Sequence, residues 1–172
     1  MAYTYVQPGQ SLTADTLNAA LMVGQVVFTA TRDTAQTFSN TASTANANTG
    51  NAVSWDAVNM DDLAGWAAAT PTRYTAQRAG WYELNGAISF AGNTTGSRVC
   101  AWFMNGSLLA GGHGQRVAAN TTTVSASAVT LPVLMAAGDY IELCAGQSSG
   151  GDLASATGGP RPSINIKFVR PV

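Results

Sequence analysis

The sequence predicts an all-β sandwich, and three observations carry that prediction. Residues 79–90 and residues 137–143 each open with a glycine at a bend and continue as an alternating strand rich in β-branched and aromatic residues. Further short strands with turn residues between them fill the chain around these two segments. The sequence shows neither an alternation of strands with helices nor an internal repeat, so a parallel α/β fold is not expected.

Composition fits one sandwich domain with a short appendage. The chain has 172 residues, which is enough to bury a core without a metal or a disulfide. Apolar residues make up 46% and charged residues only 10%. A surface with so few charged residues can pack against another protein without burying unpaired charged side chains. This favours oligomerisation or incorporation into a larger assembly.

Charge and hydropathy exclude several classes of partner. The formal net charge is −1 and the basic residues are scattered, so nucleic-acid binding is not expected. No apolar run reaches 18 residues, so no membrane span is predicted. The opening residues contain no basic region followed by an apolar stretch, and we therefore expect no signal peptide and assembly in the cytoplasm.

Residues 1–24 differ from the remainder and are expected to form an anchor segment, with the sandwich domain spanning 25–172. Residues 12–24 predict a short helix in which Thr13 is the N-cap and Leu12 and Leu17 form a hydrophobic staple. Leu17 and Leu21 contribute to an apolar stripe that is too narrow to fold alone. We therefore predict Leu12, Leu17 and Leu21 to be the anchoring side chains.

The strands follow in order after this segment. Residues 25–31 predict the first strand, and the polar run 33–51 predicts an extended surface loop or an edge strand. Asn105-Gly106 between apolar runs is a strong signal for a hairpin, because both residues tolerate positive φ. The remaining predicted strands are 52–58, 72–76, 81–91, 97–104, 107–118, 121–133, 139–147 and 162–169.

Six of these segments occur in an order that resembles a known family. They are residues 53–56, 73–75, 79–82, 98–106, 137–143 and 164–168. Together they resemble the jelly roll of tumour necrosis factor (TNF) and of the complement globular head, over about residues 25–170. The resemblance implies a TNF-like jelly-roll β-sandwich and a homotrimer packed around an axis. Trp55 stands where that family usually has Phe, and the closing strand lacks the family's usual Phe-Ser-Gly ending.

The N-terminal segment has a resemblance of its own. Residues 8–21 are similar to the opening of many bacteriophage tail and fibre proteins, with Gln10 where Asp is usual. With the jelly roll, this similarity implies a virion protein: a non-enzymatic homotrimeric knob whose partners are the major capsid or tail proteins. A capsid decoration and a minor tail protein both fit. The alternative is a receptor-binding tip for host attachment that recognises a host-surface carbohydrate or protein.

Residues able to carry catalysis, metal binding or cofactor binding are too few to predict such a site. His113 is the sole histidine, and the glycines around it fit a hairpin tip better than an oriented base. The adjacent pair Asp61-Asp62 stands alone, whereas a metal needs several converging ligands. Glu83 and Glu142 alternate with apolar neighbours and are expected to face outward. No catalytic, metal or cofactor residue is predicted.

Aromatic residues are the better candidates for contact with a ligand. Trp55 and Trp66 flank the loop around residues 60–62, where an aromatic ring could bind a sugar or a neighbouring subunit. With His113 they are the candidate ligand contacts, while Trp81 and Trp102 lie in strands and are expected to pack in the core.

Residues 98–104 carry apolar side chains on both faces of one strand. One face bears Cys100, Trp102 and Met104, and the opposite face is also apolar. This pattern predicts that a sister subunit buries the additional face, and we assign Cys100, Trp102 and Met104 to a trimer interface. Cys144 lies in another strand, so Cys100 and Cys144 either pair across neighbouring strands or remain two free buried thiols.

Overall fold

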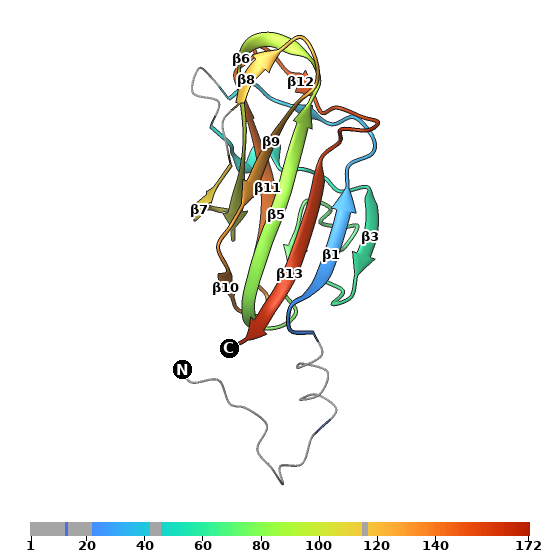
Figure 1. Cartoon of the computed structure of the whole chain (residues 1–172), viewed down its shortest axis with the longest axis vertical. Coiled ribbons are helices and arrows are strands. Elements are labelled where there is room, and N and C mark those ends of the chain that lie inside the picture. The colour runs from blue at the N-terminus through green and yellow to red at the C-terminus, as the bar shows by residue number, and fades with distance from the viewer. Residues whose placement is uncertain (1–12, 14–21, 42–45, 115–116) are drawn as a thin grey trace.

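The computed structural model describes residue 13 and residues 22–41, 46–114 and 117–172. In this part of the chain, strands form two packed sheets of six and five strands, with a small two-stranded sheet at one end (Figure 1). The all-β jelly-roll sandwich predicted from the sequence is confirmed. None of the helices in these residues is long and apolar enough to cross a bilayer.

The six-stranded sheet, called here the first sheet, is antiparallel throughout. Its order is β10–β5–β13–β1–β3, and β9 also pairs with β5. β9 pairs with residues 85–90 and β10 with residues 80–82, so both lie along the same strand, one after the other. The bounds are β1 Gln25–Thr31, β3 Ala57–Asp61, β5 Gly80–Phe90, β9 Val124–Val129, β10 Val133–Met135 and β13 Ser163–Pro171.

The five-stranded sheet, called here the second sheet, has the order β4–β11–β6–β7, and β8 also pairs with β6. Its strands are β4 Tyr74–Thr75, β6 Asn93–Met104, β7 Ser107–His113, β8 Val117–Asn120 and β11 Tyr140–Gln147. β2 Thr37–Phe38 pairs with β12 Leu153–Ala154, and a 3₁₀ turn η1 spans Thr49–Asn51.

Alternate side chains of the two sheets fill the space between them. β5 sends Tyr82, Leu84, Ile88 and Phe90 inward, and all four are fully buried. Gly86 lies in the same inward row, where a Cβ atom would stand 2.7 Å from Leu143. The core is therefore packed closely enough for the two sheets to act as a rigid support for what they display outward.

Turn chemistry explains where several strands end. Asn105 and Gly106 have φ values of 51° and 78°, as the predicted hairpin requires. Residues 107–118 and 121–133 were each expected to form one strand, but each is divided into two. Residues 52–56 form no strand, and β3 begins only at Ala57. The Asp56 carboxylate instead accepts hydrogen bonds from the backbone N–H groups of Asp33 and Thr34.

The strand predicted at residues 97–104 is longer than expected, because β6 already begins at Asn93. Arg98 is buried, and its guanidinium donates to the carbonyl oxygens of Thr95 and Ser97 and to the Asn93 side chain. These bonds curl the start of β6 around one side chain. A buried guanidinium is stable only when its donors are satisfied, so Arg98 fixes this curl.

The additional apolar face of β6 is covered by the chain itself, which corrects the prediction that a sister subunit buries it. Ala101 and Phe103 on β6 and Cys144 on β11 pack against Ala52, and Ala47 borders the cluster. The segment after η1 is held there because Ala52 forms a β-bridge with Cys144 and the Val53 N–H donates to the Leu143 carbonyl oxygen at 2.9 Å. The doubly apolar strand therefore requires no second subunit.

The predicted N-terminal helix, with Leu12, Leu17 and Leu21, lies outside the described residues apart from Thr13 and residues 22–24. Residues 42–45 of the predicted surface loop lie outside them as well.

Candidate interaction surface

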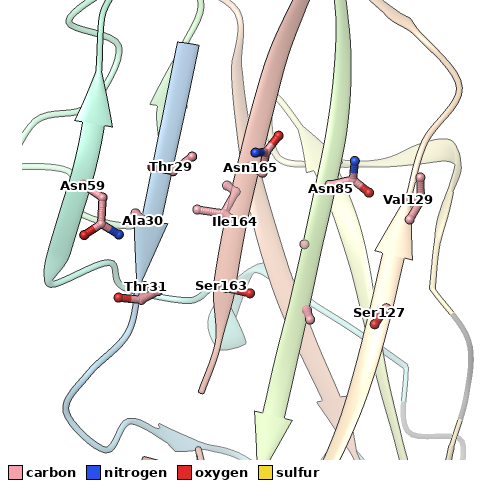
Figure 2. A pocket seen from close by; sticks show the side chains of 12 residues that line it. Thr29, Ala30, Thr31, Asn59, Asn85, Ser127, Val129, Ser163, Ile164 and Asn165 are labelled. Carbon is pink, nitrogen blue, oxygen red and sulfur yellow. The ribbon is translucent and has the colours of Figure 1, made fainter. Parts of the chain in front are cut away.

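The outward face of the first sheet carries a shallow hollow of about 480 Å³ (Figure 2). Its lining side chains are small and uncharged, and they come from neighbouring strands. Asn85 on β5 is the register partner of Asn165 on β13, which in turn faces Thr29 on β1. The lining residues are Thr29, Ala30, Thr31, Asn59, Asn85, Gly86, Ala87, Ser127, Val129, Ser163, Ile164 and Asn165.

Polar side chains in this hollow have unused hydrogen-bonding capacity. Within the described part of the chain, the carboxamides of Asn59, Asn85 and Asn165 form no hydrogen bond with another residue. Beyond Asn85 on the same face, Lys167 and Glu83 form an ion pair at 3.5 Å. The hollow therefore offers amide and hydroxyl groups without a net charge, a surface that another protein can cover at little electrostatic cost.

An apolar edge, defined by Val129 and Leu131, borders the hollow. These two side chains are exposed by 59% and 85% respectively. A groove of about 440 Å³ runs beside them between residues 109–111 and residues 129–133. Val129 lines both the hollow and the groove, so the two features form one continuous surface. Exposed apolar groups in such continuity are typical of protein–protein contact.

A second apolar area, the base patch, consists of Trp81, Leu134, Arg170 and Val172. It surrounds a hollow of about 180 Å³ at the end of the first sheet where β13 finishes. The Arg170 guanidinium stands 5.3 Å from the centre of the Trp81 ring, a cation–π geometry. Trp81, which was expected in the core, therefore lies partly exposed on the outer face.

The residues assigned to the trimer interface from the sequence lie mainly inside the domain. Cys100 and Trp102 have no exposed surface, and their Sγ and Nε1 atoms donate to the carbonyl oxygens of Ala126 and Ala128. Met104 is half-buried against the main core. Cys100 and Trp102 thus tie β6 to β9 within the chain and present no surface to a partner.

The candidate ligand contacts are not brought together. Trp55 is buried in the core, and Trp66 is half-buried with its Nε1 donating to the Pro71 carbonyl oxygen at 3.2 Å. Trp66 bridges to Tyr74 on β4, whereas His113 is exposed on β7. Since β4 and β7 are opposite ends of the second sheet, Trp66 and His113 cannot form one site in this structure.

Several of the acidic side chains have structural partners. The Asp61 carboxylate accepts hydrogen bonds from the backbone N–H groups of Gly65 and Trp66. The Asp139 carboxylate accepts one from the backbone N–H of Ala136 and one from the side-chain amide of Asn105. Glu142 was expected to face outward, but it is buried and bonded to Thr72 and Arg73. Among the described residues, no three His, Cys, Asp or Glu side chains gather closely enough to hold a metal ion.

The two cysteines are free and point to opposite faces of the second sheet. Cys100 faces Ala145 in the register of β6 and β11, and Cys144 faces Ala101. Because neighbouring positions of a strand project to opposite sides, the two thiols cannot meet. Burial raises the pKa of the Cys100 thiol to about 12 and raises that of Cys144 as well, so neither is a reactive nucleophile.

Comparison with solved structures places the fold among TNF-like and C1q-like jelly rolls. The chain is similar to the globular domain of zebrafish complement 1qA protein, with 12% identity, a TM-score of 0.56, and coverage of 86% of this chain and 100% of that one. It is also similar to Eiger TNF from S. frugiperda, with 11% identity, a TM-score of 0.55, and coverage of 86% and 94%.

Murine APRIL is a third such structure, with 13% identity, a TM-score of 0.53, and coverage of 83% of this chain and 98% of that one. No family model matches the sequence, and no curated protein matches it significantly. At these identities the similarity establishes the jelly-roll fold and leaves the function to be inferred from the surface.

The apolar edge was not recognised in the sequence, although a signal for it was present. Residues 129–133 were predicted as part of one long strand, yet Pro132 cannot donate a ladder hydrogen bond and is typical of edge strands. A proline among exposed apolar residues therefore indicated an edge. The hollow had no comparable signal, because its lining comes from strands that are far apart in the sequence.

Proposed function

We propose that this chain is a non-enzymatic structural protein of a bacteriophage virion, forming a homotrimeric knob on the capsid or the tail. A capsid decoration and a minor tail protein both fit this role. The jelly roll forms the knob, and residues 1–24 attach it to the major capsid or tail proteins of the particle.

The observation that carries the proposal is the continuous surface made by the hollow and the apolar edge. A monomer that exposed Leu131 and Val129 side by side would leave apolar area in water beside a face with almost no charge. Burial of that area against further copies removes the cost at about 25 cal/mol per Å². The resemblance to TNF and complement jelly rolls implies three copies.

Attachment to a virion is supported by the N-terminal residues and by the direction in which the chain enters the domain. Residues 8–21 are similar to the opening of phage tail and fibre proteins. The described chain enters β1 at the same end of the sandwich at which β13 finishes, leaving the loops at the opposite end free (Figure 1). A knob attached through this end would point those loops away from the particle.

Two measurements test the proposal. Light scattering coupled to size exclusion should give three times the chain mass of 17.6 kDa at micromolar concentration. Mass spectrometry and immunogold labelling of gradient-purified particles that carry this gene should detect the chain on their surface. A mass of one chain at all concentrations would contradict the trimer, and absence from the particles would contradict the virion role.

A further inference from the structure

One row of side chains crosses the outward face of the first sheet from edge to edge. Met60 on β3 is the register partner of Thr29 on β1, and Thr29 is also the partner of Asn165 on β13. Asn165 faces Asn85 on β5, whose partner on β9 is Val129. Both ends of this cross-sheet row are apolar and exposed, Met60 by 39% and Val129 by 59%. Its middle passes through the hollow (Figure 2).

The two carboxamides in the middle of the row are unpaired within the described part of the chain. Asn85 and Asn165 stand opposite each other, yet neither side chain forms a hydrogen bond with another residue. The next row toward the end of β13 differs, because Lys167 and Glu83 satisfy each other at 3.5 Å. A carboxamide has two N–H donors and an oxygen that accepts. The cross-sheet row therefore carries unused hydrogen-bonding capacity at its centre, whereas its neighbour does not.

The order of the side chains in the row limits what can cover it. A partner that buries Met60 and Val129 also buries Asn85 and Asn165, which lie between them in register. A buried carboxamide left without a hydrogen bond costs about 1–3 kcal/mol. The partner must therefore present donors and acceptors at the centre of the contact, apolar groups beside them, and no unpaired charge.

A second copy of this chain meets all three requirements. A carboxamide donates and accepts at once, so it is complementary to another carboxamide. The row has no charged member, and two identical rows therefore meet without repulsion. Val129 also lines the groove beside Leu131, so a copy that covers the apolar edge continues directly onto the row.

We propose that Asn85 and Asn165 of one copy hydrogen-bond to the carboxamides of the same residues on a sister copy, and that this pairing selects the register and the number of copies. The apolar edge and the ends of the row supply the buried area. The carboxamides penalise each arrangement in which they stay unpaired, as a buried Asn does between coiled-coil helices. This pairing rests on the proposed assembly of copies and is independent of a virion role.

Leucine substitutions in the full chain test the selection. Leucine has nearly the shape of asparagine but forms no hydrogen bond, so Asn85→Leu/Asn165→Leu keeps the contact area and removes the pairing. We expect this variant to associate with loss of the single oligomeric mass, giving a mixture of masses by native mass spectrometry. The matched control is Asn46→Leu/Asn48→Leu, which changes two exposed carboxamides in the loop before η1. It should keep the mass of the wild type.

Three results would contradict the proposal. A single mass equal to that of the wild type in Asn85→Leu/Asn165→Leu would show that the carboxamides select nothing. Dissociation of that variant into single chains would show that the apolar groups do not hold the copies together. A mixture of masses in the control as well would assign the effect to added surface leucine. Circular dichroism verifies that each variant keeps the sandwich.

The wild-type mass separates this proposal from the proposed function. A wild-type chain that stays single refutes the assembly itself, and the pairing with it. A wild-type oligomer whose mass survives the leucine substitutions refutes the pairing alone and leaves the assembly in place.

Cysteine cross-linking provides a direct test of proximity between copies. Asn85→Cys and Asn165→Cys are prepared singly and also co-expressed, and each sample is oxidised mildly. Pairing between copies should place two of these positions within disulfide reach, so at least one sample should give a two-chain band on a non-reducing gel. Asn48→Cys is the control and should give none, and the native cysteines are buried. Absence of the band from all three samples at the wild-type oligomeric mass, or an equal band in the control, would overturn the pairing.

Discussion

At the scale of single residues, several acidic side chains of this protein stabilise the fold through hydrogen bonds and ion pairs. The free energy that each contact contributes depends on its burial. Glu142 is buried and accepts hydrogen bonds from the Thr72 hydroxyl at 2.6 Å and the Arg73 Nε at 3.2 Å. Glu83 pairs with Lys167 at 3.5 Å, but both side chains are more than a third exposed. The two pairs thus separate the effect of burial from that of opposite charge.

Glutamine substitutions at these two positions should differ in cost. Glu142→Gln removes charge-assisted bonds from a desolvated group, and we expect a loss of about 1–3 kcal/mol in the free energy of unfolding. Glu83→Gln removes a solvent-screened pair and should cost less than about 1 kcal/mol. Urea denaturation of both variants measures the difference. Equal losses in the free energy of unfolding would show that the buried contacts of Glu142 with Thr72 and Arg73 stabilise the fold no more than the exposed pair does.

Asp56 gives the protein a pH dependence of predictable sign. Burial alone would raise the pKa of its carboxyl, but hydrogen bonds from the Thr34 hydroxyl and from the backbone N–H groups of Asp33 and Thr34, with Arg32 nearby, outweigh it and lower the pKa. A carboxylate with a lowered pKa stabilises the folded state at pH above its unfolded value of about 3.9. That stability is lost as the pH falls through the folded pKa.

The measurement is unfolding by urea at pH 6 and at successively lower pH down to 3. The wild-type protein should lose stability below about pH 4, and Asp56→Asn should lose less over the same interval because its side chain does not titrate. Asp33 also has a lowered pKa, chiefly through its hydrogen bond to Arg161, so the variant keeps part of the slope. An undiminished slope in Asp56→Asn would contradict this account.

At the scale of elements, the local sequence pattern predicted where the strands lie, but it did not predict which segments pack over their faces. β1 and the hairpin at residues 105–106 follow from period-two alternation and turn chemistry, which act between neighbours in sequence. The residues that pack over Phe103, around Ala52, lie about 50 positions earlier in the chain. Patterns between neighbours in sequence cannot predict a contact between segments so far apart. The pattern correctly indicated that both faces of β6 are buried, but it could not distinguish the chain's own loop from a second subunit.

The origin of this cover can be tested at Phe103. Phe103→Ala should lower the free energy of unfolding by about 3 kcal/mol, because it opens a cavity under the chain's own segment around Ala52. Its register partner Leu108 is exposed, so Leu108→Ala should cost less than about 1 kcal/mol. Urea denaturation gives both values. Loss of the oligomer in Phe103→Ala without loss of chain stability would instead support a subunit contact at this face.

At the scale of the whole molecule, the candidate surface is a product of topology. Val129 and Asn85 are register partners although they lie 44 positions apart, and Asn165 joins them from the last strand. The fold could be predicted from the sequence because each strand has its own signal. The contact residues were predicted at side chains that are buried, such as Trp55 and Trp102, since residue type alone does not reveal which face of a sheet is outward.

The apolar edge allows the proposed assembly to be broken without damage to the fold. Leu131 is 85% exposed, so Leu131→Asp strands no charge in the monomer but places one in any interface that covers the edge. We expect this variant to elute as a single chain while its circular dichroism matches the wild type. Ala68→Asp, in the exposed loop between β3 and β4, introduces the same charge away from the edge and should leave the oligomer intact. If Leu131→Asp retained the full oligomeric mass, the apolar edge would not be the contact between copies, and the hollow on the first sheet would have to be tested in its place through Asn85.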